Sequence, residues 1–238
     1  MAPTKSKSFE ALLEVMAPLP EAFETGTYRL RYRRVGHIAH GWMKRCARGI
    51  EAVMLLQRSG YAGEAAPLMR SVVEHSVALR WLVAEGPDIL PTLMTNHQGG
   101  TKRLLDAALA LAKGIVDEKH FRKVIESAEH DDHSRDNLQH FAARVDRYGT
   151  LQDQIEYFGY MLTSHATFQS AIAYWDQSDE TPRPTDANAA DYRKQGAVYL
   201  YLALKSYSSI FVAPPWSSTL REVRGRIVDL EPGLYKIP

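Results

Sequence analysis

The chain of 238 residues is 45% hydrophobic and 24% charged, and its formal net charge is +1. This composition allows a sizeable core and excludes an intrinsically disordered chain. The near-neutral balance leaves no global field that would draw the chain onto nucleic acid or an anionic membrane, so binding of that kind has to depend on a local patch.

Hydrophobic periodicity is helical almost throughout the chain, and no alternating strand pattern stands out. The predicted segments, in chain order, are a short helix starting after Ser6 or Ser8, long helices over about 28–58 and 61–85, shorter ones over about 88–98, 101–113, 117–129 and 135–147, long ones over about 150–176 and 188–212, and a short one near 217–229. The pattern therefore predicts an all-α fold, a bundle of about four long helices with several short capping helices.

We expect a single helical domain over 1–238, since no linker is long enough to separate two domains. Its parts are an N-terminal helix and arm (1–27), the bundle (28–213) and a C-terminal short helix and tail (214–238).

The helix predicted over 28–58 begins with the basic segment "TYRLRYRRVGH". Arg29, Arg33 and Arg34 lie there among tyrosines, and this combination can bind a phosphate backbone or stacked bases. They are candidate substrate-binding residues. The alternative is a helix start that is only solvated.

The helix over 61–85 carries apolar stripes on two opposite sides, so it should be central in the bundle. Arg70 and Glu74 interrupt one stripe one turn apart, and His75 lies on the other. Two buried charges need further partners, because the desolvation of each ion costs more than one surface-type pair returns. We expect a partner from another helix.

The stripe of the helix over 150–176 contains Leu151, Ile155, Phe158, Leu162, His165, Phe168 and Ile172. If this stripe faces the core, His165 can meet Arg70 and Glu74. Two interpretations stay open for such a cluster. It holds two helices in register, or it is a site in which His165 moves a proton and Arg70 binds an anionic group. His75 is interpreted as a satisfied core or interface histidine.

The polar run "EHDDHS" gathers three weak candidates for metal ligands, His130, Asp131 and His133. A metal-dependent phosphohydrolase at this segment is one hypothesis, and a polar loop leading into a helix is the other. The sequence contains no nucleophile elbow, phosphate-binding glycine loop or dinucleotide fingerprint, so we expect no cofactor.

Cys46 is the only cysteine, which excludes an internal disulfide and a cysteine-rich zinc site. No apolar run reaches the roughly 20 residues of a membrane-spanning helix, and the N-terminal stretch lacks the apolar core of a signal peptide. We therefore expect a cytoplasmic protein without membrane contact.

The segments "GYAGEAAPLMRSVVEHSVALRWL" (60–82) and "YFGYMLTSHATFQSAIAYW" (157–175) resemble a widespread bacterial family of helical proteins of unassigned function. The matched positions are Gly60, Glu64, Ala65, Arg70, Glu74, Ser164 and His165. The resemblance implies that Arg70, Glu74 and His165 form the candidate catalytic site and that Ser164 contributes to substrate binding.

Such proteins are similar to the HEPN superfamily, helical bundles that include ribonuclease toxins with an Arg-x4–6-His motif used across a dimer. Two stretches have this spacing, Arg70 to His75 and Arg135 to His140, and they are alternative catalytic pairs. The resemblance implies a homodimer, RNA or a nucleotide as ligand, metal-independent ribonuclease activity, and a defence or toxin–antitoxin setting with a cognate antitoxin or defence partner. A non-catalytic helical scaffold or small-ligand sensor is the alternative function.

Overall fold

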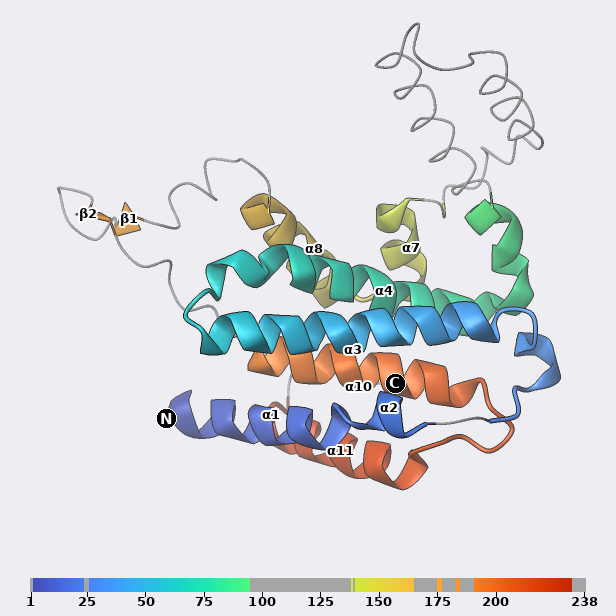
Figure 1. The fold of residues 1–238 in the computed structure, drawn as a ribbon. Coiled ribbons are helices and arrows are strands. Elements are labelled where there is room, and N and C mark those ends of the chain that lie inside the picture. The colour runs from blue at the N-terminus through green and yellow to red at the C-terminus, as the bar shows by residue number, and fades with distance from the viewer. Residues whose placement is uncertain are drawn as a thin grey trace, which may run out of the picture.

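The computed structural model describes residues 2–23, 26–94, 138, 140–164, 175–176, 183–184 and 191–232. The described helices are α1 (Ala2–Met16), α2 (Leu19–Ala22), α3 (Gly36–Arg58), α4 (Ala66–Glu85), α7 (Phe141–Tyr148), α8 (Leu151–Ser164), α10 (Arg193–Ser209) and α11 (Ser217–Leu230). Single 3₁₀ turns lie at Leu30–Tyr32, Gly63–Ala65 and Gly86–Ile89, and the two-residue strands β1 (Trp175–Asp176) and β2 (Arg183–Pro184) pair antiparallel. The predicted all-α class is confirmed (Figure 1).

Helix α4 is central in the bundle, as its two apolar stripes predict. It packs against α3, α8, α10 and α7, while α1 and α11 contact α10 from its other side. The layer of α3, α4 and α10 is therefore covered by α7 and α8 on one side and by α1 and α11 on the other (Figure 1). On α4 the buried side chains include Val72, Leu79 and Leu82 from one stripe and Val77 and Trp81 from the other.

The helix with the most complete burial is α10. Every residue of the run 197–204 is buried, because α1, α3, α4 and α11 all pack against this helix. Tyr207 of α10 is buried as well, and so is Phe211, two residues beyond the end of the helix. This burial comes from neighbouring helices, and no helix in the described ranges combines the length and the hydropathy needed to cross a membrane.

Helix α3 starts at Gly36, so the helix predicted from residue 28 begins later than expected. The reason is a backbone bridge between Tyr28 and Phe211. Arg29 N donates to Ile210 O and Val212 N donates to Thr27 O, both at 2.9 Å, which holds 27–29 extended beside the end of α10. The arginine-rich segment is therefore a bridge and a 3₁₀ turn, and not the first turns of a helix.

Helix α8 faces the core with a different side from the predicted one. The aliphatic and aromatic stripe Leu151, Ile155, Phe158 and Leu162 is 71%, 57%, 44% and 42% exposed. The buried residues of α8 are instead Asp153, Glu156 and Tyr157. The predicted inward stripe is therefore wrong for residues 151–162, because polar partners on α4 and α10 select the polar side of the helix. The expected helical end near residue 176 is also wrong, since Trp175–Asp176 forms β1.

Candidate functional site

Arg70 and Glu74 lie one turn apart on α4, at the edge of the buried region. Arg70 Nε is 3.4 Å from Glu74 Oε1, and the two side chains are 27% and 33% exposed. The expected ion pair is present, and it is half-buried. Because an arginine followed by a glutamate at this spacing contributes at most about 0.5 kcal/mol alone, further contacts must support it.

Tyr157 of α8 is the residue that joins this pair. Arg70 Nη2 donates to Tyr157 Oη at 2.9 Å, and the phenol hydroxyl is in turn hydrogen-bonded to the Glu74 carboxylate. The guanidinium carbon of Arg70 lies 5.0 Å from the centroid of the Tyr157 ring, within cation–π range. Burial, together with the charge of Glu74, raises the pKa of Tyr157, so the phenol remains protonated and able to donate.

A second guanidinium group approaches from α7. Arg144 Cζ lies 5.7 Å from the ring centroid of Trp81, and burial lowers the pKa of Arg144 while the charge of Glu74 opposes that shift. Phe141 stacks on Tyr157 with ring centroids 3.9 Å apart, which fixes α7 against α8. We refer to four residues as the outer cluster, namely Arg70, Glu74, Arg144 and Tyr157.

A second ion pair lies deeper between α4 and α8. Arg80 Nη1 donates to Asp153 Oδ2 at 3.0 Å, and Arg80 Nη2 lies 3.0 Å from Asp153 Oδ1. The Asp153 side chain is only 1% exposed, and Tyr199 of α10 donates to its Oδ1 at 3.1 Å. The hydrogen bond from Arg80 Nη1, the close positive charge of Arg80 Nη2 and the Tyr199 hydroxyl supply the partners that a buried carboxylate requires.

Asp153 also starts α8. The backbone N and the Oγ1 of Thr150 donate to Asp153 Oδ2 at 2.5 and 2.7 Å, and Asp153 N donates back to Thr150 Oγ1 at 3.2 Å. This reciprocal pattern is a capping box with aspartate in the place of the usual glutamate. One carboxylate therefore sets both the beginning of α8 and its rotation against α4 and α10.

The two buried carboxyl groups of α8 have pKa values shifted in opposite directions. Burial favours a higher pKa for Asp153, but the hydrogen bond and charge of Arg80, with the donors of Thr150, outweigh it and hold that pKa below its usual range. Burial is also the largest influence on Glu156, and there it raises the pKa although neighbouring groups donate to the carboxylate. Two carboxyl groups with opposed pKa shifts suit acid–base chemistry. Asp153 is fully buried, however, so the ion pair between Arg80 and Asp153 serves packing.

Three of the predicted site residues have local roles in the structure. Ser164 Oγ donates to the carbonyl of Tyr160 within α8. His75 is half-buried, and its Nδ1 lies 2.6 Å from Ser71 O in the preceding turn. His140 is exposed directly before α7. None of these contacts brings Ser164, His75 or His140 to the outer cluster.

Several other candidates lie outside the described residues, namely His130, Asp131, His133, Arg135 and His165. The meeting of His165 with Arg70 and Glu74 therefore stays a prediction. Within the part of the chain that the structure describes, no three His, Cys, Asp or Glu side chains gather as ligands for a metal ion.

The arginine-rich segment packs at the opposite end of α4 from the outer cluster. Arg31 Nη2 donates to Ala84 O at 2.7 Å, which is fourteen residues, or about 21 Å of helix, from Arg70. The contact of Arg31 with α4 therefore lies far along this helix from Arg70. Arg33 and Arg34 are exposed in the turn before α3.

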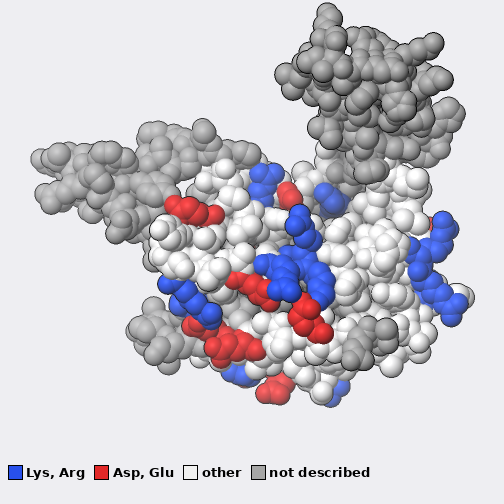
Figure 2. Space-filling view, viewed as in Figure 1, with Lys and Arg blue, Asp and Glu red and all other residues white. Residues whose placement is uncertain are grey.

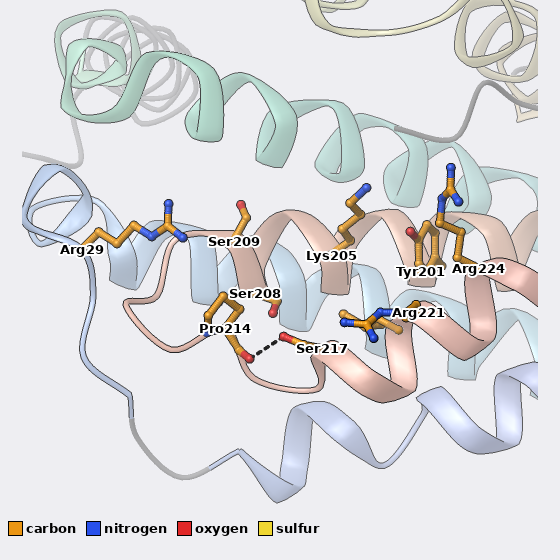
Figure 3. Close-up of a pocket in the computed structure, with 10 residues that line it drawn as sticks. Arg29, Tyr201, Lys205, Ser208, Ser209, Pro214, Ser217, Arg221 and Arg224 are labelled. Carbon is orange, nitrogen blue, oxygen red and sulfur yellow. Dashed lines mark hydrogen bonds between the residues drawn. The ribbon is translucent and has the colours of Figure 1, made fainter.

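Arg29 lines a pocket between the end of α10 and α11, shown in Figure 3. Its Nε donates to Phe211 O at 2.9 Å, which orients the rest of the guanidinium group. Lys205 of α10 and Arg221 of α11 line the same pocket. A basic site does include one of the predicted arginines, but its other members come from helices near the C-terminus.

Sequence reasoning did not find Arg80, Arg144 or Tyr157. A signal for the polar side of α8 is nevertheless present, because Thr150-x-x-Asp153 fits the capping-box pattern that marks a helix start. Tyr157 follows Asp153 by one turn, so it lies on the same side of the helix. The partners of Tyr157 on α4 and α7 could be identified only from the fold.

Comparison with known proteins identifies a family whose function is unknown. Residues 36–182 match the model of DUF5677, a family of unknown function. This range is more than half of the chain and contains α3, α4, α7 and α8, and therefore the whole outer cluster, whereas α10 and α11 lie beyond it. No curated protein and no solved structure matches the chain. The chain therefore belongs to the DUF5677 family of unknown function.

Proposed function

We propose that this protein is HEPN-like and binds RNA, with the outer cluster as the contact site. One observation supports this most directly: two guanidinium groups, one carboxylate and one phenol converge from three helices at a half-buried position. Two cations beside one anion leave a positive balance, and planar guanidinium groups suit phosphate oxygens. The stacked aromatic rings of Phe141 and Tyr157 offer an adjoining apolar surface.

The same cluster supports metal-independent cleavage of RNA. A ribose 2′-oxygen attacks the adjacent phosphorus, forms a new O–P bond and displaces the 5′-oxygen. Arg70 and Arg144 stabilise the negative charge on the phosphorane, and Glu74 accepts the 2′-hydroxyl proton. His165, the residue after Ser164 in the chain, is the candidate donor of a proton to the leaving oxygen.

The first test is binding of a single-stranded RNA oligonucleotide, followed by fluorescence anisotropy. Arg70→Gln should weaken binding about tenfold or more, because it removes a charge-assisted contact to phosphate. Arg48→Gln is the matched control, since Arg48 forms an exposed ion pair on α3, away from the outer cluster. Absence of RNA binding by the wild type, or equal losses in both variants, would refute the proposal.

Cleavage is tested separately on the same oligonucleotide by gel electrophoresis. His165→Ala should abolish cleavage while RNA affinity and melting temperature stay unchanged. This is the result expected for a group whose only role is to donate a proton to the leaving oxygen. Tyr157→Phe keeps the ring and its stacking on Phe141 but loses the hydroxyl that links Arg70 to Glu74. It should reduce cleavage more than it reduces stability.

A non-catalytic scaffold or small-ligand sensor is the second candidate function. The observation in its favour is the adjoining Arg80–Asp153 pair, which is buried and serves packing. If the outer cluster only extends that packing, Arg70→Gln will lower the melting temperature and leave RNA binding unaffected. The two measurements therefore separate the candidates.

The proposal also includes assembly, which the HEPN resemblance implies. We propose a homodimer and a cognate antitoxin or defence partner. The exposed stripe of α8 is the described surface that suits a second copy of the chain, because it consists of large apolar side chains.

A further inference from the structure

A pocket of about 350 Å³ lies between α10, α11 and the segment that precedes α3. Figure 3 shows Arg29 at one end, Arg224 at the other and Lys205 between them. Tyr201 and Leu220, both buried, contribute apolar wall. The volume is at the lower end of the roughly 300–1,000 Å³ found for small-molecule sites, which suits a ligand of mononucleotide size.

The charge of this pocket is of one sign. Four cationic side chains from three parts of the chain line it, namely Arg29, Lys205, Arg221 and Arg224, and its described lining contains no Asp or Glu. The whole chain has a net charge of only +1. Four positive charges around one concavity are therefore a local concentration, and the concave shape focuses their field.

Basic residues elsewhere on the surface are arranged differently. On the face seen in Figure 2, blue and red side chains lie next to each other across the middle of the molecule. Ion pairs that involve α3 include Lys44 with Glu21 at 2.8 Å and Arg48 with Glu51 at 2.9 Å. Lys44 and Arg48 on α3 thus lie beside carboxylates, whereas no Asp or Glu is among the described residues that line the pocket.

The cations of the pocket also act on one another. Lys205 has a lowered pKa, first because of burial and second because of the positive charge of Arg224. Holding these two like charges together is unfavourable in the folded protein, and a bound anion would offset the repulsion. The arrangement is one that a negatively charged ligand stabilises.

The hydroxyl groups of the pocket limit how the ligand is held. Ser208 Oγ donates to Pro215 O at 2.5 Å, and Ser217 Oγ donates to Pro214 O at 2.8 Å. Their protons are used within the protein, so these serines can only accept hydrogen bonds from a ligand. The guanidinium and ammonium groups are therefore the charged donors for an anion, while the oxygens of Ser208 and Ser217 can accept from ligand hydroxyl or amino groups.

We propose that this pocket binds a small organic phosphate of mononucleotide size, with the phosphate among Lys205, Arg221 and Arg224 and the organic part against Tyr201 and Leu220. The site lies on the opposite side of the bundle from the outer cluster and beyond the residues that match the family. It does not rest on the proposed RNA function, and it gives the protein a second, separate ligand.

The test is calorimetric titration of the full chain with adenosine monophosphate and, in parallel, with inorganic phosphate. The nucleotide should bind, and more tightly than phosphate, because only the nucleotide can use the apolar wall. Arg221→Gln should weaken nucleotide binding about tenfold, the effect of one charge-assisted contact. Arg221 is exposed, so this variant should fold normally.

Arg226→Gln is the matched control, since Arg226 lies on α11 but does not line the pocket. It should bind the nucleotide with unchanged affinity, and so should Arg70→Gln. Failure of the wild type to bind at millimolar nucleotide, equal affinity for phosphate and nucleotide, or an equal loss in Arg226→Gln would overturn the proposal. None of these results would bear on RNA binding at Arg70.

Discussion

Asp153 illustrates how strongly one residue can determine the position of a helix. Its carboxylate receives hydrogen bonds from Arg80, Tyr199 and Thr150, which belong to α4, α10 and the start of α8. Asp153→Asn leaves the Arg80 guanidinium buried without its counter-charge. We expect a loss of about 3–5 kcal/mol in the free energy of unfolding, measured by urea denaturation at neutral pH. Asp88→Asn, at an exposed position, should change it little.

The pH dependence of that loss follows from the lowered pKa of Asp153. Folding favours the ionised form, so the stabilisation is complete above the pKa of an unfolded aspartate, about 3.9. It is lost as pH falls through the lower folded pKa. The difference between wild type and Asp153→Asn should therefore shrink in strongly acidic solution. A difference that stays constant down to that range would contradict the ion-pair explanation.

Glu156 should respond to pH in the opposite direction, because burial raises its pKa. The folded state binds this proton more tightly than the unfolded state does, so the favourable contribution is present below the unfolded pKa of about 4.3 and is lost as pH rises through the folded value. Glu156→Gln keeps the shape without the charge. Urea denaturation should show the variant gaining stability relative to wild type as pH rises toward neutral, and a relative loss would contradict this.

At the scale of an element, the start of α3 depends on a close approach that only glycine allows. A Cβ atom at Gly36 would lie 2.5 Å from the ring of Tyr28, whereas one at Gly41 on the same helix would meet nothing within 4 Å. Gly36→Ala should therefore lower the free energy of unfolding by about 1–3 kcal/mol. Gly41→Ala should raise it by up to about 1 kcal/mol. Thermal or urea unfolding of the two variants gives the comparison, and equal effects would contradict it.

Periodicity predicted the buried side of some helices and the wrong side of one, and it placed helix ends several residues off: α1 starts at Ala2 and not after Ser6 or Ser8. In α10 and α1 the most apolar side of the helix is also the side with neighbours, so apolar periodicity and burial agree there. In α8 the most apolar side is not the side with neighbours. Arg80 is held inside by α4, and its charge needs Asp153, so the polar side of α8 faces the core and the apolar stripe is left outside. A hydrophobicity scale ranks the sides of a helix by the free energy of transfer from water to an apolar environment. It does not include the stabilisation that a buried carboxylate gains from a buried cation.

For the whole molecule, the candidate site was predictable in part. The proximity of Arg70 and Glu74 follows from helical spacing alone, and the need for a third partner follows from desolvation. The identity of that partner, Tyr157, depends on the rotation of α8, which local sequence does not determine. The basic pocket was not predictable, because Arg29 is separated from Lys205 and Arg221 by most of the chain and joins them through the bridge between Tyr28 and Phe211.

The exposed stripe of α8 leads to a prediction about assembly. Leu151, Ile155, Phe158 and Leu162 recur at steps of four, three and four, the spacing of a seam between two helices. The stripe contains no charged residue, so two copies related by a two-fold axis can meet there without like-charge repulsion. We expect the wild type to sediment as a dimer in analytical ultracentrifugation.

Ile155→Glu should shift that dimer to monomer, because each copy would place a carboxylate in the seam. The side chain is 57% exposed, so the substitution should leave the fold of the single chain intact, and circular dichroism checks this. Leu30→Glu is the control, since Leu30 is 78% exposed and lies in the 3₁₀ turn before α3. A monomeric wild type would refute the homodimer. A dimer that survives Ile155→Glu would place the interface elsewhere, because a carboxylate buried twice in an apolar seam has no partner to offset its desolvation.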